Sequence, residues 1–564
     1  MDCRGKIECR RIKKLTVNDM SGLNNIEIKI DKRNLVDKLK GYFDKKECIC
    51  LIFALVGGLF AHLYAIVNDV YNYDSIRQLW YGDGITSGRW FLQFLGDLSE
   101  LAWGGWHVDF FNRTITLVIL VFVAGMIPKI FNIKNMYISV IASVLFVVYP
   151  TSTSMMFFSF TSVYYAIAIL MIAFAVLILD AKYIGPFAAS VLITYATGIY
   201  QASFTFAATL VFIKLIILLL EKRDLKFKSI LKKSGVYFLV LLIAYIHYYL
   251  MTKITIYIYG DGLTSYQNID SLGLKKIGQL PNIILETWKG YFEALFLKEN
   301  HGYGISLTGI TRVSALLFLI LSIIIIGHFL LKKYEAIKKF YLIILFVVFP
   351  IVVNSINIAC YGNWIYTLMV YAFYGSLLLP LLLLDLYIED CAIAGNLMFK
   401  RMGELVKLLQ LFFATLVCFN YAYQSNGNYL AMHQADQIAA NKIMLIMSQV
   451  YDLDGYKPDM RIVFVNSYSN EQNSDILNGS PFHYGGQGNP LNHYTINTFA
   501  ETYIGIYPNI STIYTGSTEN YYKIDSYNED KVVKNMPLYP ENGSIRIYND
   551  EVIVKFNPEY LLYE

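Results

Sequence analysis

The residues best suited to chemistry lie in one polar stretch, 68–90, with the sequence NDVYNYDSIRQLWYGDGITSGRW. It contains the carboxylates of Asp69 and Asp74 and the guanidinium groups of Arg77 and Arg89. A carboxylate can act as a general base toward an attacking hydroxyl, while an arginine can hold an anionic leaving group with two parallel hydrogen bonds. The alternative is a solvated loop whose charges pair with one another, as is common between membrane spans.

The composition indicates what must position this stretch. Of the 564 residues, 56% are hydrophobic and only 16% are charged, and the apolar residues come in long blocks. We therefore predict an all-α polytopic membrane protein. The small net charge of +4 is spread over the ends of the apolar blocks, which argues against nucleic-acid binding. Seven cysteines, none of them in the stretch 68–113, give no disulfide framework.

Eleven apolar stretches are long enough to cross a membrane. They are 48–67, 114–131, 136–153, 161–180, 183–199, 203–220, 235–256, 312–331, 339–357, 364–386 and 403–422. Lysine and arginine are enriched in the connections on one side, and the positive-inside rule assigns that side to the cytoplasm. These connections include 128–135, 221–233 and 331–339. The segment 1–47 is then cytoplasmic, and the odd number of spans puts the C-terminus outside.

Three large segments are expected on the outer face: loops 68–113 and 257–311, and a tail, 423–564, that follows the transmembrane domain 48–422. The first loop contains FLQFLGDLSELAWGGW, whose apolar residues recur at helical spacing, so we expect an interfacial helix there. The second loop has a helix-like centre between polar ends. The tail combines a helix at 429–450, a strand at 461–467 and a hairpin about Asn549 and Asp550, which predicts a small extracytoplasmic α/β domain.

Other common sites are missing from the sequence. It has no phosphate-binding loop motif, no HExxH and no G-x-S-x-G, and His483 and His493 have no cysteines near them that would suggest a zinc site. Ionisable residues are scarce within the predicted spans, where His62 and His247 are interpreted as packing residues. This scarcity argues against an ion-coupled transporter.

Two motifs in the first loop resemble a known family. Asn68…Tyr73-Asp74-Ser75 fits N-x-x-x-x-[HY]-D-S, and S-G-R-W follows at 87–90. Together they resemble the phage-type, serotype-converting membrane glucosyltransferases, the O-antigen glucosyltransferase II group. The segment MPLYPENGSIRIYNDEVIVKF (536–556) resembles the closing segment of the same family. The resemblance implies the architecture of class C glycosyltransferases, multi-span enzymes that use a polyprenyl-phosphate sugar donor and an aspartate of the first outer loop.

The resemblance also implies roles for individual residues. Asp74 is the expected catalytic base. Some relatives have two adjacent aspartates in this loop, whereas here Asp69 and Asp74 are separated, so Asp69 is the alternative base. By the resemblance, Arg89 and Arg77 are expected to bind the donor phosphate, and Lys289 and Arg312 are the next candidates for that role. The residues expected to contact substrate are Trp90, Tyr73, Ser75 and His301. No cofactor is expected, and a divalent metal is optional.

The expected reaction moves a hexose, glucose by the resemblance, from a polyprenyl phosphate to a hydroxyl of a bacterial surface glycan. It would occur at the outer face of the cytoplasmic membrane, with inversion at the anomeric carbon. The expected partners are the lipid bilayer, the lipid-linked donor and the glycan acceptor, with a polyprenyl-phosphate glucose synthase and a flippase acting earlier. The alternative is a non-enzymatic transporter of glycan or lipid-linked oligosaccharide.

Overall fold

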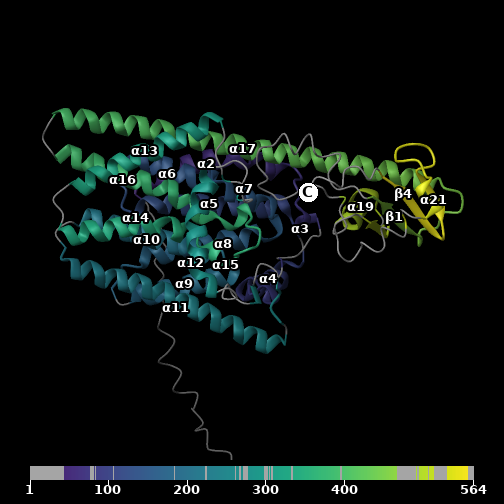
Figure 1. The fold of residues 1–564 in the computed structure, drawn as a ribbon, viewed down its shortest axis with the longest axis horizontal. Coiled ribbons are helices and arrows are strands. Elements are labelled where there is room, and N and C mark those ends of the chain that lie inside the picture. Colours follow the sequence, from purple (N-terminus) through teal and green to yellow (C-terminus); the bar gives the residue numbers. More distant parts are fainter. Residues whose placement is uncertain are drawn as a thin grey trace, which may run out of the picture.

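The computed structural model is an elongated molecule in which a small sheet follows a bundle of helices along the long axis (Figure 1). It describes residues 44–556 apart from a set of internal exceptions. These are 77–81, 83, 106, 183, 223–224, 261, 266–268, 271–276, 297–302, 304, 306–308, 332–334, 394–396, 467–490, 492–494, 506, 514–526 and 528–529.

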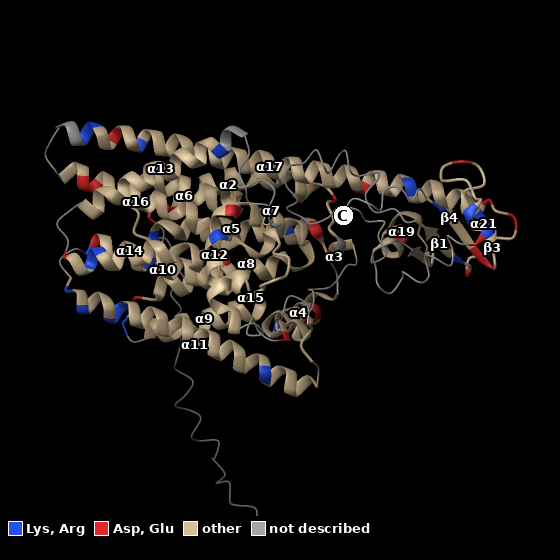
Figure 2. Cartoon of the chain, viewed as in Figure 1, with Lys and Arg blue, Asp and Glu red and all other residues tan. Residues whose placement is uncertain are grey.

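Nine helices in the described part of the chain are long and apolar enough to cross a membrane. They are α2 (Lys45–Val67), α5 (Asp109–Ile130), α6 (Met136–Val148) continued by α7 (Pro150–Phe157), α8 (Ser159–Ile178), α10 (Ser203–Glu221), α11 (Phe227–Tyr259), α13 (Gly309–Leu331), α14 (Ala336–Val353) and α17 (Leu397–Tyr451). Lysines, arginines and acids lie mostly near the ends of these helices (Figure 2). The predicted polytopic, all-α membrane fold is confirmed.

Two of the eleven predicted spans differ in form from these nine. The span predicted at 183–199 is α9 (Ile184–Ile199), which at 16 residues is shorter than a usual membrane helix. The span predicted at 364–386 is helical only in its second half, as α16 (Gly375–Ile393). It begins with two 3-10 turns, η5 (Thr367–Met369) and η6 (Tyr371–Tyr374). Hydropathy did not distinguish these turns from a helix because their residues are equally apolar.

Short elements connect the long helices, and those between residues 73 and 103 lie toward the end of the bundle that faces the sheet, which we call the sheet end (Figure 1). They are α3 (Tyr73–Ile76), η2 (Ile85–Ser87), α4 (Trp90–Trp103), η4 (Ile277–Gln279), α12 (Leu280–Phe296) and α15 (Ile356–Ala359). The amphipathic helix predicted in the first loop is α4, and its Phe94, Leu98, Leu101 and Trp103 are exposed. The helix-like centre predicted for the second loop is α12.

The C-terminal unit is a four-stranded sheet with the order β2-β1-β4-β3. The strands are β1 (Arg461–Val465), β2 (Ile510–Ile513), β3 (Ile545–Tyr548) and β4 (Glu551–Lys555), and the short helices are α19 (Ile496–Ile504) and α21 (Lys531–Lys534). Strand β1 pairs in parallel with β2 and β4, while β3 and β4 form the predicted hairpin. Asn549 and Asp550 both have positive φ, as a tight two-residue hairpin turn requires.

Helix α17 joins the bundle to the sheet without a break (Figure 1). The sequence suggested a span at 403–422 and a separate helix at 429–450, but both belong to this one helix of 55 residues. The segment between them, 423–428, contains Gly427 but no proline, and all of it is helical. The predicted domain boundary at 422 and 423 therefore falls inside a continuous element.

Candidate active site

The first part of the polar stretch, residues 68–76, is called the entry stretch, and Arg113 of α5 fixes it to the bundle. The fully buried Arg113 side chain donates hydrogen bonds to the carbonyl oxygens of Ala65 (2.7 Å), Asn68 (3.0 Å) and Met156 (2.9 Å). A buried guanidinium is stable only when its donors are satisfied, and here oxygens from α2, the entry stretch and α7 satisfy them. Arg113 thus sets the place where the chain leaves α2.

Helix α17 also holds the entry stretch. The Nδ1 atom of His433 donates to the backbone oxygen of Asp69 (2.8 Å), and the backbone N–H of Tyr71 donates to Oδ2 of Asp436 (3.3 Å). The Asp436 side chain is buried, whereas Asp69 is exposed. Burial, together with the nearby carboxylates of Asp436 and Asp69, raises the pKa of Tyr503 in α19 to about 12. The Tyr503 phenol therefore stays protonated at neutral pH.

Asp74 lies in α3, a single turn in which the next two residues, Ser75 and Ile76, are both fixed. Ser75 donates through Oγ to the carbonyl oxygen of Phe157 (2.6 Å) at the end of α7, and its N–H donates to Oδ1 of Asn72 (2.9 Å). Ile76 is buried in the hydrophobic core that α17 forms with the sheet. The half-buried Asp74 is thus held between the bundle and the C-terminal unit.

Residues 87–90, called the SGRW stretch, are fixed by polar contacts to the bundle. The side chain of Gln201 donates to the backbone oxygen of Ser87, and the hydroxyl of Tyr248 donates to that of Gly88 (3.2 Å). Gly88 has a φ of 69° and lies so close to the bundle that a Cβ atom would approach the Tyr248 oxygen to 2.9 Å. Glycine is required here both by the left-handed conformation and by the close approach.

The two side chains that follow Gly88 have different surroundings. The guanidinium carbon of Arg89 lies 5.3 Å from the ring centroid of Tyr200, which is a cation–π distance. Trp90 is only 6% exposed, and its ring packs edge-on to Tyr195 with centroids 5.3 Å apart. A Cβ atom on Gly198 would come within 2.7 Å of the Trp90 ring, so the two helices meet closely there. Trp90 therefore anchors the stretch beside Arg89.

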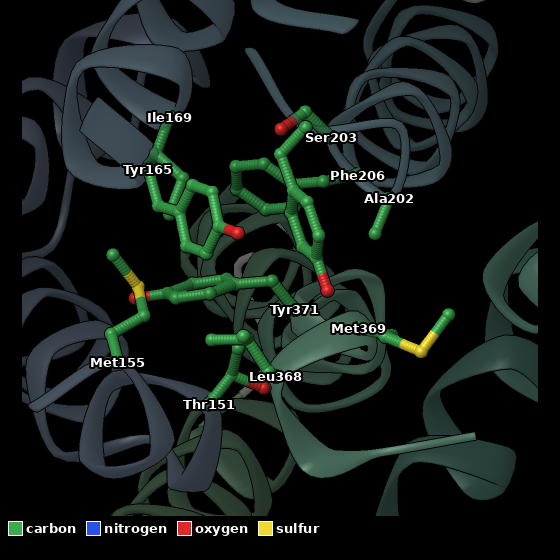
Figure 3. A pocket seen from close by; sticks show the side chains of 11 residues that line it. Thr151, Met155, Tyr165, Ile169, Ala202, Ser203, Phe206, Leu368, Met369 and Tyr371 are labelled. Carbon is green, nitrogen blue, oxygen red and sulfur yellow. The ribbon is translucent and has the colours of Figure 1, made fainter. Parts of the chain in front are cut away.

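A pocket opens next to Tyr200, between α7, α8, the turn from α9 to α10, and η5 (Figure 3). Its lining residues are Thr151, Met155, Tyr165, Ile169, Tyr200, Ala202, Ser203, Phe206, Leu368, Met369 and Tyr371. It holds about 310 Å³ of empty space, including the part open to its surroundings. The rings of Tyr165 and Tyr200 are stacked, with centroids 4.3 Å apart. The pocket thus combines aromatic faces with hydroxyl groups.

Helix α7 links this pocket to the two stretches. Met155 lines the pocket, and Phe157, two residues later, accepts the hydrogen bond from Ser75. On the other side, the pocket residue Tyr200 lies beneath Arg89. The Asp74 turn therefore borders the end of α7, and Arg89 borders a residue of the pocket that α7 helps to line.

The remaining predicted site residues are less closely defined. Lys289 is exposed on α12, and Arg312 is half-buried in the first turns of α13. Tyr73 belongs to α3, but its side chain lies outside the described residues, as do Arg77 and His301. Of the arginines predicted to bind phosphate in the first loop, Arg89 is the one whose surroundings are described.

Three residues at the site were not singled out from the sequence. Arg113 directly precedes the predicted span 114–131. Its place beside an apolar run could have marked it as a residue that fixes the loop before the span. Asp436 falls on the predicted helix 429–450 among apolar residues, where an acid needs a buried partner. Tyr200 gave no signal, because nothing in its spacing distinguishes it from the many tyrosines of the chain.

Within the described residues, no group of three or more histidine, cysteine, aspartate or glutamate side chains is arranged to hold a metal ion. A polar cluster at the sheet end pairs His107 with Asp109 and with Ser159 Oγ (3.1 Å). Asp109 also lies 3.9 Å from Arg113. This cluster connects the start of α5 to the start of α8 and supports the Arg113 anchor.

Comparison with known proteins identifies a family for this arrangement. Residues 63–376 match the family model described as Glucosyl transferase GtrII, a match that includes both stretches, Arg113 and the pocket. Neither a curated protein nor a solved structure matches the chain. The resemblance expected from the loop motifs is confirmed, and a glucosyltransferase is favoured over a transporter. Because the match spans more than half of the 564 residues, the chain belongs to the glucosyl transferase GtrII family.

Proposed function

We propose that this membrane glucosyltransferase takes glucose from a polyprenyl phosphate and transfers it to a hydroxyl of a bacterial surface glycan. The reaction is assigned to the outer face of the cytoplasmic membrane, which is the sheet end of the bundle. The family match supports the transferred sugar, and the nine apolar helices support a donor that resides in the bilayer. The concentration of lysine and arginine in the connections at the other end supports the sidedness.

The observation that carries the proposal is the arrangement around α7. The Asp74 turn is joined to α7 through Ser75 and Phe157, and Arg89 is joined to the pocket beside α7 through Tyr200. A carboxylate and a guanidinium are the two groups that a glycosyl transfer from a phosphate donor needs. Both are carried by one connecting segment at the end of an apolar bundle.

The proposed reaction is a single displacement. The Asp74 carboxylate takes the proton of the acceptor hydroxyl while the hydroxyl oxygen forms a bond to the anomeric carbon of glucose. The bond from that carbon to the phosphate oxygen breaks, and both of its electrons leave with the polyprenyl phosphate. Arg89 stabilises the charge that develops on the leaving phosphate. Since a phosphate is already a weak base, no acid is needed to protonate it, and the anomeric carbon is inverted.

The proposal is tested with purified protein in nanodiscs, radiolabelled polyprenyl-phosphate glucose and a surface glycan acceptor. We expect label in the glycan and an equal amount of free polyprenyl phosphate, with both formed far more slowly by the Asp74→Asn variant. UDP-glucose serves as the control donor and should give no transfer. Movement of intact lipid-linked sugar across vesicles, without cleavage of the glucosyl bond, would support the transporter instead.

The sidedness is tested separately. A reporter fused after Glu564 should be accessible from outside the cell, and a reporter inserted in 221–233 should be accessible only from the cytoplasm. The opposite result would place Asp74 and Arg89 on the cytoplasmic face and would contradict the assignment of the reaction to the outer face.

A further inference from the structure

Helix α11 turns one face toward the lipid bilayer along most of its length. The residues of its other face are buried against the bundle at helical spacing: Ile230, Tyr237, Val240, Ala244, Tyr248 and Thr252. The large apolar residues of the first face are exposed, also at helical spacing: Leu231, Phe238, Leu239, Leu242, Ile246 and Leu250. Because an exposed apolar face on a membrane-spanning helix contacts acyl chains, we call this face the lipid face of α11.

Three lysines continue the lipid face at the start of α11. Lys228 and Lys232 lie one helical turn apart on this face, and Lys226 directly precedes the helix. All three side chains are exposed, and together we call them the lysine row. Figure 2 shows basic residues at this end of α11, which is the end farthest from the sheet. The lipid face thus changes from apolar to basic at the end of the bundle opposite the sheet end.

The position of the lysine row along α11 matches the boundary of a bilayer. No lysine, arginine, aspartate or glutamate lies between Lys233 and Lys253 in the sequence. Lys232 and Lys253 both lie on the lipid face, and a rise of about 1.5 Å per residue separates them by about 32 Å. The hydrocarbon core of a bilayer is about 30 Å thick. Lys232 is therefore placed at the level of the lipid headgroups, and Lys226 and Lys228 lie just beyond it.

The lysines that face inward at this end of the bundle have counter-charges within the protein. Oxygens of the Asp180 carboxylate lie 2.7 Å from Nζ of Lys233 and 3.1 Å from Nζ of Lys214. The Nζ atom of Lys338 is likewise 3.2 Å from a carboxylate oxygen of Glu335. Among the residues that the structure describes, no carboxylate forms an ion pair with the lysine row. Anions from outside the protein are therefore its counter-charges.

An anionic lipid suits the lysine row better than a small anion does. Like charges four residues apart on a helix, such as those of Lys228 and Lys232, repel each other, and a bound anion relieves that repulsion. Anionic headgroups attract each lysine near a membrane surface by an energy that corresponds to about fivefold in affinity. A lipid also packs its acyl chains on the adjoining apolar part of the lipid face. Charge and apolar contact therefore favour the same ligand.

We propose that the lysine row binds the phosphate groups of anionic phospholipids, whose acyl chains pack on the lipid face of α11. Because the row lies at the level of the headgroups, a phospholipid of the same bilayer reaches it without leaving the membrane. This binding is independent of the transferase reaction proposed above. On the sidedness proposed above, the bound lipids belong to the cytoplasmic leaflet, whose surface is negatively charged.

The test localises a bound lipid on α11. Full-length protein in a neutral detergent is mixed with photoreactive phosphatidylglycerol, and the label in residues 227–239 is quantified by mass spectrometry. Unlabelled phosphatidylglycerol and phosphatidylcholine are added as competitors. We expect phosphatidylglycerol to compete at least about tenfold more effectively, because only its headgroup carries a net negative charge. Inorganic phosphate in excess should not compete, since it has no acyl chains.

The decisive variant combines Lys226→Gln, Lys228→Gln and Lys232→Gln. At about fivefold for each lysine, its labelling should fall by at least about tenfold and up to about 100-fold. The same three positions changed to arginine keep their charge and should keep the labelling. Both variants should unfold at the wild-type temperature in neutral detergent, because exposed side chains contribute little to packing.

The matched control changes three exposed lysines of the C-terminal unit instead, with the same loss of charge. It combines Lys457→Gln, Lys531→Gln and Lys534→Gln. Labelling of residues 227–239 should be unchanged in this variant, because the C-terminal unit lies at the other end of the molecule (Figure 1).

Four results would contradict the proposal. Equal competition by phosphatidylglycerol and phosphatidylcholine would show that α11 does not select anionic lipids. Unchanged labelling of the glutamine variant of the lysine row would place the binding on other residues, and an equal loss in the control variant would reduce the effect to net charge. Displacement of the label by soluble polyglutamate, as effective as displacement by phosphatidylglycerol, would indicate an acidic protein partner instead. None of these results would affect the proposed transfer of glucose.

Discussion

The two stretches of the candidate site are adjacent in sequence but are held by different parts of the molecule. The SGRW stretch is fixed within the bundle, through Gln201, Tyr248 and the packing of Trp90 on Gly198. The entry stretch is fixed partly by Arg113 and partly by α17 and the core beneath the sheet.

On the proposed roles, this difference separates two functions. The contacts described for the stretch that carries Arg89 come mainly from the transmembrane bundle. The carboxylate that would activate the acceptor depends also on the C-terminal unit, because Ile76 belongs to that unit's core. The sheet is thus part of the support of the active site, and changes near it should affect the chemical step more than donor binding.

The largest effect is expected for Asp74→Asn. The amide keeps the size of the side chain but cannot accept the proton, so the transfer rate should fall by roughly 10²–10⁴, as for other lost general bases. Donor binding should be unchanged, because Arg89 is held by the bundle. The measurement is the initial rate of glucosyl transfer in nanodiscs, with Asp69→Asn compared under the same conditions. A normal rate for Asp74→Asn and a large loss for Asp69→Asn would reverse the assignment of the base.

Arg89→Lys should have the next largest effect. Lysine keeps the charge and can remain over Tyr200, but it lacks the planar pair of donors that binds phosphate bidentately. We expect kcat/KM for the donor to fall about 10–100-fold, within the range of a lost charge-assisted hydrogen bond. Trp90→Phe is the control, since it changes the anchor and keeps the arginine.

If Arg89 only forms an interfacial ion pair, the lysine variant should be nearly silent, because such pairs contribute about 0–1 kcal/mol. Normal donor dependence would then remove Arg89 from the site and leave Lys289 or Arg312 as candidates.

Ile76→Ala probes the dependence of the entry stretch on the C-terminal unit. Truncating a buried isoleucine costs about 2–5 kcal/mol of local packing, and the α3 turn can relax into part of that space. We expect kcat to fall about tenfold while the KM of the donor stays unchanged. The matched control is Ile547→Ala in β3. Ile547 packs against the same core but lies in a strand and not in the loop that carries Asp74. Equal effects of both variants would show that general destabilisation is responsible.

His433→Ala should have the smallest effect. It removes one hydrogen bond to the Asp69 backbone, which is worth about 0.5–1.5 kcal/mol, so kcat should fall no more than about tenfold. Gln437→Ala is the control, because Gln437 bonds to His433 but not to the entry stretch. An increase in the donor KM for His433→Ala would contradict the division between the two stretches.

Much of the fold follows from hydropathy and turn chemistry. The long apolar runs predicted the bundle, the helical spacing around Phe94 and Leu98 predicted α4, and the Asn549–Asp550 pair predicted the hairpin. The sequence did not indicate β2, because a four-residue strand in parallel pairing needs a distant partner that local patterns do not reveal. The continuity of α17 was missed because a polar segment between two helical patterns resembles a linker.

Asp74 and Arg89 of the candidate site were chosen by type and spacing in the first loop, and their roles stay predictions. The structure places the Asp74 turn beside the end of α7 and Arg89 over the ring of Tyr200. The supports of these residues were not predictable, because Arg113, Tyr200 and Asp436 act through contacts between segments far apart in the chain. Such contacts depend on how the helices pack, which periodicity does not determine.

The length of α17 has a consequence for the reach of the enzyme. Its 55 residues, at about 1.5 Å each, make a rod of roughly 80 Å, of which the hydrocarbon core of a bilayer takes up only about 30 Å. The length of α17 beyond the hydrocarbon core therefore sets how far the sheet stands from the bilayer.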